Sequence, residues 1–327
     1  MAAVQQKEVN ADENGMRLDR WFKVYFPGLG FGALQKLLRS GQIRVNGGRV
    51  KAETRLETGQ VVRIPPLQVD EKNNAPLTRN TIKGRDDSDV LSQMLIYEDP
   101  KVYVFNKPAG LAVQGGSGVS RHVDGMLESW RNKKGEKPRL VHRIDRETSG
   151  VLVVARTRGA AQALTAAFRE RETKKYYWAL VRGVPRKHED KISTWLVKEA
   201  TPQGDKMRVC AHGEPNSDHA VTYYRVIDTA GRTLSWLEMQ PFTGRTHQLR
   251  VHAASLDHPI IGDPKYFFAD QNWDLPGGIQ NRLHLHARRI RIPNPSGGVL
   301  DVTAPLPPHM VQSFNLLGFD ENDAGEE

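Results

Sequence analysis

Residues 141–157, VHRIDRETSGVLVVART, constrain the fold more than any other part of the chain. Here Asp145 follows a histidine and an arginine, a Thr-Ser-Gly turn is expected at residues 148–150, and apolar, β-branched residues occupy 151–154. The pattern predicts an exposed loop that leads into a buried strand. An aspartate crowded by cations stays ionised, which suits a nucleophile or an electrostatic stabiliser better than a general acid. A purely structural ion pair would produce the same short pattern.

The charge of the chain favours a polyanionic partner. The 327 residues include 47 Lys and Arg against 38 Asp and Glu, which gives a formal net charge of +9. Five of the acids fall in the last eight residues, so the rest of the chain is more basic still. Nucleic acid fits this excess better than a membrane, because no basic amphipathic anchor and no run of about 18 apolar residues is present.

The termini and the cysteine content limit the setting of the protein. Cys210 is the single cysteine, which excludes an intrachain disulfide framework and a Cys-rich zinc site. The first 15 residues lack the apolar segment of a secretory signal. We therefore expect a cytoplasmic protein without a membrane anchor, and we predict that it is a monomer.

Three long motifs resemble the RluA family of pseudouridine synthases. The central motif is HRIDRETSGVLVVA at 142–155, and it is flanked by YEDPKVYVFNKPAGLAVQGGSG at 97–118 and GRTHQLRVHAASLDHPIIGDPKY at 244–266. With the N-terminal segment described below, the resemblance covers nearly the whole chain. It implies an enzyme that isomerises uridine in RNA without metal or cofactor, on a long mixed sheet with the active-site cleft across its middle.

The resemblance also implies roles for single residues. Asp145 falls on the catalytic aspartate of the family, and Arg245 on the arginine that pairs with it and would keep it ionised and aimed. Tyr177, in the family pattern K-x-Y-x-A, would stack on the flipped uracil while its hydroxyl serves in proton transfer from C5. The remaining predicted pocket residues are His142, Arg143, Thr148 and Leu249.

A small basic module is predicted before the catalytic part of the chain. Between residues 16 and 64, ten Lys and Arg stand against three Asp and Glu, and helically spaced apolar residues precede a short strand and a tight turn. The strings RLDRWF, LLRSGQIRVNG and GQVVRIP resemble the S4 RNA-binding domain. The residues predicted to contact phosphates are Arg17, Arg20, Lys36, Arg39, Arg44 and Lys51.

The predicted fold class is α+β, with a small S4-type domain followed by a synthase domain on a mainly antiparallel sheet. The expected segments are a disordered leader at 1–15, the S4-type domain at 16–65, a linker at 66–92, the synthase domain at 93–318 and an acidic tail at 319–327. Strands are predicted at 102–105, 151–155, 176–181, 192–197, 221–227, 234–239 and 299–302, and helices at 160–171 and 247–256.

Several competing interpretations are weaker. The glycine-rich residues 115–118 lack the spacing of a phosphate-binding loop, and the kinase-like string at 142–145 lacks the other kinase motifs. The histidines at 247, 252, 258, 284 and 286 show no metal-ligand pattern, so we predict hydrogen-bonded packing or RNA contacts for them. Large-subunit ribosomal RNA is the leading substrate. The alternatives are a transfer-RNA or broad-specificity uridine isomerase and a non-catalytic, RNA-binding ribosome-assembly factor.

Overall fold

The chain forms two compact units in a computed structural model, and each unit is described by itself. The described residues are 4–10, 13–26, 29, 31–67, 86–116, 119–133, 135–201, 205–267 and 277–325. The first unit comprises Met1–Ala75, Ala269–Arg282 and Pro308–Glu327, and the second comprises Pro76–Phe268 and Leu283–Pro307. Within the described residues, no helix is long and apolar enough to cross a membrane.

The first unit packs helices on a three-stranded antiparallel sheet. The sheet has the order β1-β3-β2. Its strands are β1 (Gln5–Glu8), β2 (Arg44–Val45) and β3 (Val61–Ile64), and its helices are α1 (Leu18–Tyr25), α2 (Phe31–Arg39), α8 (Pro308–Leu317) and a 3-10 turn at Glu321–Ala324. Trp21, Phe22 and Leu34 lie in its buried core, as their helical spacing predicts. Helix α1 packs against α8.

The structure corrects the predicted segments at both ends of the chain. The leader is not disordered throughout, because β1 pairs with β3, and Val9, the residue that follows β1, is buried. The side chains of Gln5–Glu8 are polar and mostly exposed, so composition does not reveal a strand that the backbone holds. At the other end, α8 belongs to the first unit although we assigned it to the synthase domain, and Ala324 of the predicted tail is buried.

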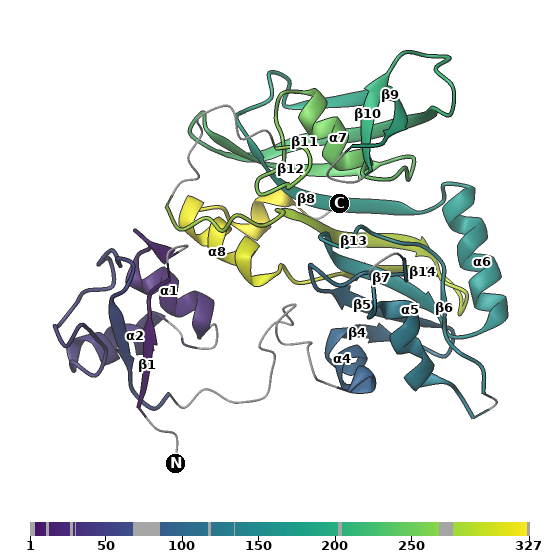
Figure 1. The fold of residues 1–327 in the computed structure, drawn as a ribbon. Coiled ribbons are helices and arrows are strands. Elements are labelled where there is room, and N and C mark those ends of the chain that lie inside the picture. The colour runs from purple at the N-terminus through teal and green to yellow at the C-terminus, as the bar shows by residue number, and fades with distance from the viewer. Residues whose placement is uncertain are drawn as a thin grey trace. The chain divides into compact units, whose positions relative to one another are not determined.

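An eleven-stranded sheet forms the second unit (Figure 1). The main path runs β10-β9-β11-β12-β8-β13-β7-β5-β4, with β14 paired to β13 and β6 to β7. The pair β13–β7 is parallel and the other pairs among the described strands are antiparallel, which confirms the predicted mixed, mainly antiparallel sheet. The strands are β4 (Leu95–Glu98), β5 (Val102–Lys107), β6 (Arg139–Leu140), β7 (Ser149–Ala155), β8 (Lys174–Arg182), β9 (Glu189–Glu199), β10 (Lys206–Cys210), β11 (Asp218–Ala230), β12 (Leu234–Pro241), β13 (Leu285–Pro293) and β14 (Val299–Thr303).

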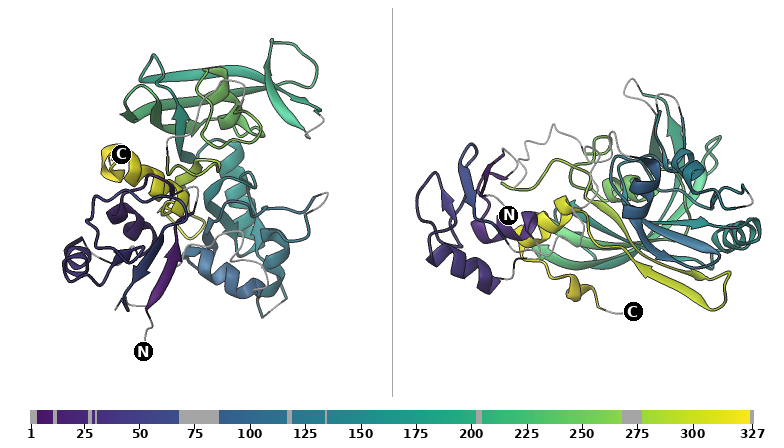
Figure 2. Two further views of the ribbon diagram at one scale, coloured as in Figure 1. Left: turned by 60° about the vertical axis from the view of Figure 1, so that its left-hand side comes forward. Right: turned by 90° about the horizontal axis from the view of Figure 1, so that it is seen from below.

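The helices of this unit pack on different parts of the sheet (Figures 1 and 2). They are α4 (Asp87–Met94), α5 (Val123–Met126) with a 3-10 turn at Leu127–Trp130, α6 (Arg158–Arg169) and α7 (Gln248–Ser255). Helix α6 packs near β7 and β13, and α7 packs on β10, β11 and β12. The predicted helices at 160–171 and 247–256 correspond to α6 and α7 within a few residues.

Helix α4 corrects the end of the predicted linker, of which residues 68–85 lie outside the described residues. The helix starts after Asp86, whose carboxylate accepts a hydrogen bond of 2.8 Å from the Ser88 amide. Val90, Leu91 and Met94 are almost fully buried. Three apolar residues in a polar stretch of one helix are too few to show a periodic pattern in the sequence.

Strand β7 lies between β13 and β5 in the sheet and is buried along its whole length. It starts with Ser149 and Gly150, where the sequence predicted a turn. Gly150 has φ +108°, and a Cβ there would lie 2.2 Å from the Ala287 carbonyl oxygen of β13. Only glycine allows the two backbones to approach this closely. The loop before β7 therefore ends at a fixed point of the core.

Candidate active site

A cavity of about 590 Å³ opens near the middle of the large sheet. Its walls come from β8, from residues 141–148 before β7, from α6 and from residues 241–250 around the start of α7. All the predicted catalytic and pocket residues line it: Asp145, Tyr177, Arg245, His142, Arg143, Thr148 and Leu249. Segments more than a hundred residues apart in sequence thus meet at one site.

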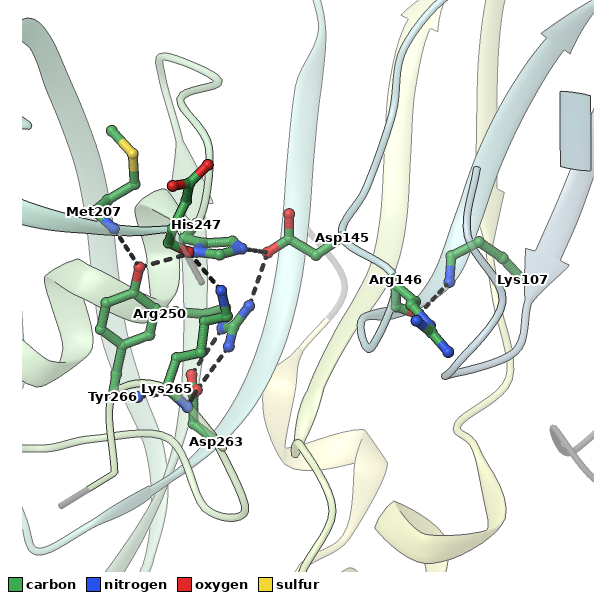
Figure 3. A network of polar contacts seen from close by, with 10 residues as sticks. Lys107, Asp145, Arg146, Met207, His247, Arg250, Asp263, Lys265 and Tyr266 are labelled. Atoms are coloured by element: carbon green, nitrogen blue, oxygen red, sulfur yellow. Dashed lines mark hydrogen bonds and ion pairs between the residues drawn. The ribbon is translucent and has the colours of Figure 1, made fainter. Parts of the chain in front are cut away.

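Asp145 faces two basic side chains from the α7 side of the cavity (Figure 3). Its Oδ2 lies 3.4 Å from Arg250 Nη1 and 3.9 Å from His247 Nε2. The side chain keeps 21% of its surface exposed, so the carboxylate remains accessible from the cavity. The Asp145 carbonyl accepts a 3.2 Å hydrogen bond from the Thr148 amide, which tightens the loop behind the carboxylate.

Arg250 is fixed in place by a second aspartate. Its Nε and Nη2 donate to the two carboxylate oxygens of Asp263 at 2.8 and 2.7 Å, a bidentate pair in which Asp263 is fully buried. Burial alone would lower the pKa of Arg250, but the hydrogen bonds and charge of Asp263, with the charge of Asp145, raise it above its usual value. Arg250 therefore carries a permanent positive charge at a defined distance from Asp145.

The pairing of Arg245 with Asp145 was predicted wrongly. Arg245 Nη1 lies 3.3 Å from the exposed Asp218, and its Nε donates to the His219 carbonyl at 3.3 Å. Arg245 precedes α7 and is exposed. Arg250 lies within the helix, is buried, and reaches Asp145. The sequence motif contains both arginines, but Arg250 stands between Leu249 and Val251, and a charge in an apolar helical stretch signals a buried, paired residue.

His247 also faces Asp145, and its imidazole is neutral. Burial lowers its pKa, although the nearby Asp145 opposes the shift. Its Nδ1 lies 2.9 Å from the Tyr266 hydroxyl, which also accepts a 2.8 Å hydrogen bond from the Met207 amide. With φ +52° at the start of α7, the residue adopts a left-handed backbone that is uncommon outside glycine. We infer that these contacts fix the imidazole beside Asp145.

Gln248 holds the loop that precedes α7. Its Oε1 accepts hydrogen bonds from Thr243 Oγ1 at 2.7 Å and from the Arg245 amide at 3.0 Å. Its Nε2 donates to the Val221 carbonyl and the Thr222 hydroxyl, both at 2.9 Å. This side chain is 3% exposed, and a buried amide with every contact satisfied rigidifies the wall that it joins to β11.

Lys107 supports the Asp145 loop from behind (Figure 3). Its fully buried ammonium donates to the carbonyls of Pro108, Leu111 and Arg146 at 2.9, 2.8 and 3.1 Å. Burial lowers its pKa to about 7, against the charges of Glu147 and Asp145. Sequence analysis missed Lys107, His247, Gln248, Arg250 and Asp263 as site residues, because their roles depend on contacts between distant segments.

Tyr177 lies on β8 and lines the cavity. Its ring packs against the hydrophobic clusters on both sides of the site. Burial raises the pKa of the phenol, and the charge of Asp145 raises it further. The hydroxyl therefore stays protonated at neutral pH. Tyr176 is buried on the opposite face of the strand, as the alternation predicts.

The other predicted pocket residues have distinct environments. His142 accepts a 2.8 Å hydrogen bond from the Val153 amide and stacks on Phe168, and burial with the charge of Lys175 lowers its pKa to about 3. It is thus a neutral part of the wall. Arg143 is exposed and Thr148 is buried, and both line the cavity.

Two other histidines of the predicted group, His252 and His286, are hydrogen-bonded packing residues. His252 lies 2.8 Å from Thr222 Oγ1 and 3.0 Å from Thr194 Oγ1, and His286 lies 2.9 Å from Ser149 Oγ. Burial lowers their pKa values to about 4 and about 3. No cluster of three or more potential metal ligands occurs among the residues that the structure describes.

The predicted phosphate contacts of the first unit fall into two groups. Lys36, Arg39 and Lys51 are exposed and available to a ligand. Three others have contacts within the unit: Arg17 pairs with Asp19 at 2.7 Å, Arg44 donates to two carbonyls, and the half-buried Arg20 donates to the Leu316 carbonyl of α8. Arg20 is therefore better explained as a contact between helices than as a phosphate ligand.

The chain belongs to the family of RNA pseudouridylate synthases, whose members isomerise uridine to pseudouridine in RNA. Residues 101–255 match the sequence profile of this family. The ribosomal large subunit pseudouridine synthase C of Haemophilus influenzae (strain ATCC 51907 / DSM 11121 / KW20 / Rd) is 37% identical over 300 residues, which cover 91% of this chain and 89% of that protein. The enzyme of the same name from Escherichia coli (strain K12) is 37% identical over 307 residues, covering 91% and 92% of the two chains.

Solved structures agree with this assignment. Human RNA pseudouridylate synthase domain containing 4 is 31% identical, with a TM-score of 0.59 over 71% of this chain and 95% of that one. Human RNA pseudouridylate synthase domain containing 1 is 30% identical, with a TM-score of 0.53 over 65% and 83%. The resemblance seen in the motifs, the predicted enzyme class and RNA as the partner are thereby confirmed.

Proposed function

We propose that this enzyme converts uridines of large-subunit ribosomal RNA to pseudouridine, with Asp145 as its catalytic carboxylate. The observation that carries the proposal is the cavity in which Asp145 faces the fixed guanidinium of Arg250. Relatives that match nearly the whole chain bear names that specify the large ribosomal subunit, which supports the same RNA as the substrate here.

The reaction needs few groups, and the cavity supplies them. The bond between uracil N1 and ribose C1′ breaks, the base turns, and C5 bonds to C1′, while C5 loses a proton and N1 gains one. Asp145 acts at the ribose, either by attack on C1′ or by deprotonating the sugar. The permanent charge of Arg250, 3.4 Å away, aims the carboxylate in both routes.

Tyr177 and the cavity walls would hold the detached base. The ring of Tyr177 offers an aromatic face beside Asp145, suited to stacking on a flipped uracil. Because the pKa of its phenol is raised, the hydroxyl acts as a proton donor or relay in neutral form, and not as a preformed base. Arg245 would contribute through substrate contacts at the cavity edge, since Asp218 is its present partner.

We further propose that the first unit is an S4-type RNA-binding domain. The exposed Lys36, Arg39 and Lys51 support this role, which is one of affinity and placement. Cytoplasmic location and a monomeric state remain predictions from the sequence. The alternatives are a transfer-RNA or broad-specificity isomerase and a non-catalytic assembly factor, and the complete set of Asp145, Tyr177 and Arg250 speaks against the last of these.

Mapping pseudouridines in cells that lack the gene tests the substrate. We expect specific positions in large-subunit ribosomal RNA to lose pseudouridine and to regain it when the wild-type gene is restored. Loss of pseudouridine at transfer-RNA positions alone would favour the alternative of a transfer-RNA isomerase. No change in any RNA, together with altered ribosome assembly, would contradict the proposed function and favour the assembly factor.

A further inference from the structure

The wall of the cavity carries an excess of positive charge that Asp145 does not balance. Six arginine or lysine side chains line it, and Asp145 is the one acid among the described lining residues. The six are Arg143, Arg169, Arg171, Lys175, Arg245 and Arg250. Three of the six have a carboxylate other than Asp145 as a partner: Arg250 binds Asp263, Arg245 binds Asp218, and Arg169 lies 3.5 Å from Glu170.

Lys175 differs from these three arginines because it has no carboxylate partner among the described residues. It lies two positions before Tyr177 on β8, so both side chains point to the cavity face of the strand. The ammonium is half-buried near the loop before α7, 3.9 Å from the place that a Cβ on Gly244 would occupy. Within the described part of the chain, it makes no ion pair or hydrogen bond.

A half-buried ammonium without a counter-charge is costly for the free protein. Burial lowers the pKa of Lys175 to about 8, so the group is still mostly charged at neutral pH. The adjacent His142 is neutral and cannot compensate it. A charged group that destabilises the free protein is retained where a ligand supplies the opposite charge. Uracil is neutral, and the anionic group of an RNA nucleotide is its phosphate.

We propose that Lys175 anchors a backbone phosphate of the RNA strand whose uridine enters the cavity. The inference rests on the proposed function and deepens it. It assigns the β8 side of the cavity to the backbone of the RNA and the α7 side to the reacting ribose. Lys175 is then a positioning residue: a compact, flexible ammonium suits a single phosphate as a point charge.

The test compares Lys175→Met with Lys174→Met. The two lysines are neighbours on β8 and lose the same charge in the same substitution, but Lys174 is exposed on the other strand face. Affinity for in vitro transcribed large-subunit ribosomal RNA and for oligouridylate is measured across potassium chloride concentrations. For Lys175→Met, we expect several-fold weaker binding and a salt slope shallower by about 0.7, the value for one single-strand phosphate contact. Lys174→Met should retain the wild-type slope, and Lys175→Arg should restore most of it.

Thermal unfolding of the free variants separates this role from a structural one. Removal of an unpaired, half-buried charge should leave the Tm of Lys175→Met equal to or above that of the wild type. A lower Tm together with weaker binding would make Lys175 a structural residue and overturn the inference. So would an unchanged salt slope, an equal loss in Lys174→Met, or a loss of turnover at unchanged affinity. Binding is read without turnover, so wild-type protein that forms no pseudouridine contradicts the proposed function alone.

Discussion

The α7 side and the β8 side of the cavity treat positive charge in opposite ways. On the α7 side, Arg250 is held by two hydrogen bonds to the buried Asp263 before any substrate arrives. On the β8 side, Lys175 has no counter-charge among the described residues. The comparison teaches that the charge aimed at the reacting carboxylate is fixed within the protein, whereas the charge for the RNA strand is left for the substrate to neutralise.

The largest effect should come from breaking the fixed pair. Arg250→Met leaves the buried Asp263 without its cationic partner, and losses of about 3–5 kcal/mol in unfolding free energy are typical of such sites. Arg245→Met makes the same chemical change, but its partner Asp218 is 59% exposed, so we expect a loss below about 1 kcal/mol. Urea unfolding of both variants measures the difference, and equal losses would contradict the assignment of Arg250 as the buried partner.

A double variant separates stability from activity. Arg250→Met combined with Asp263→Leu removes both members of the buried pair, and it should regain part of the lost stability. Turnover should stay low in the double variant, because Asp145 has lost the charge that aims it. Recovery of the wild-type rate along with stability would show that Arg250 serves the fold and not the reaction.

Tyr177→Phe should give the next largest effect. The variant keeps the aromatic face and loses the hydroxyl, so we expect RNA binding close to wild type and a single-turnover rate slower by about 10²-fold, the low end for proton transfer by a positioned group. Quench experiments at saturating RNA measure that rate. If it does not change, the hydroxyl takes no part in the reaction and stacking alone remains.

A smaller effect is expected from the exposed cations of the first unit. Replacing Lys36, Arg39 and Lys51 together by alanine should weaken binding of large-subunit ribosomal RNA and lower the salt slope by about 2 or 3. The single-turnover rate at saturating RNA should not change, since these residues lie in a different unit from Asp145. A normal salt slope would mean that this surface does not contact the RNA.

The smallest effect concerns stability against pH. The folded-state pKa of Lys175 is about 8, below the ordinary value of 10.5 in an unfolded chain. Its unfavourable contribution is therefore complete below pH 8 and disappears as the pH rises from 8 to about 10.5, because the unfolded chain then binds more protons. Wild-type protein should gain stability relative to Lys175→Met across that window, measured by urea unfolding. Parallel curves would show that the ammonium is not buried.

The sequence predicted the features that local pattern controls. The apolar run after Asp145 predicted β7, and the strand predicted at 176–181 corresponds to β8, which carries Tyr177. These predictions hold because a strand that is buried on one or both faces leaves a direct signature in residue order.

The sequence could not predict features that depend on distant contacts. The choice between Arg245 and Arg250 is made by Asp263 and by the point at which α7 begins. Strand β1 is polar and forms through backbone pairing with β3, so composition does not show it. Helix α8 joins the first unit although nearly the whole second unit separates them in sequence.

The most direct test of the central claim is the single-turnover rate of Asp145→Asn on large-subunit ribosomal RNA. The substitution keeps the shape of the side chain and removes its charge, and Asp218→Asn makes the same change at an exposed carboxylate. We expect Asp145→Asn to bind RNA like the wild type and to form no pseudouridine. Asp218→Asn should convert uridines of the same RNA at close to the wild-type rate. Comparable conversion by Asp145→Asn would contradict the account.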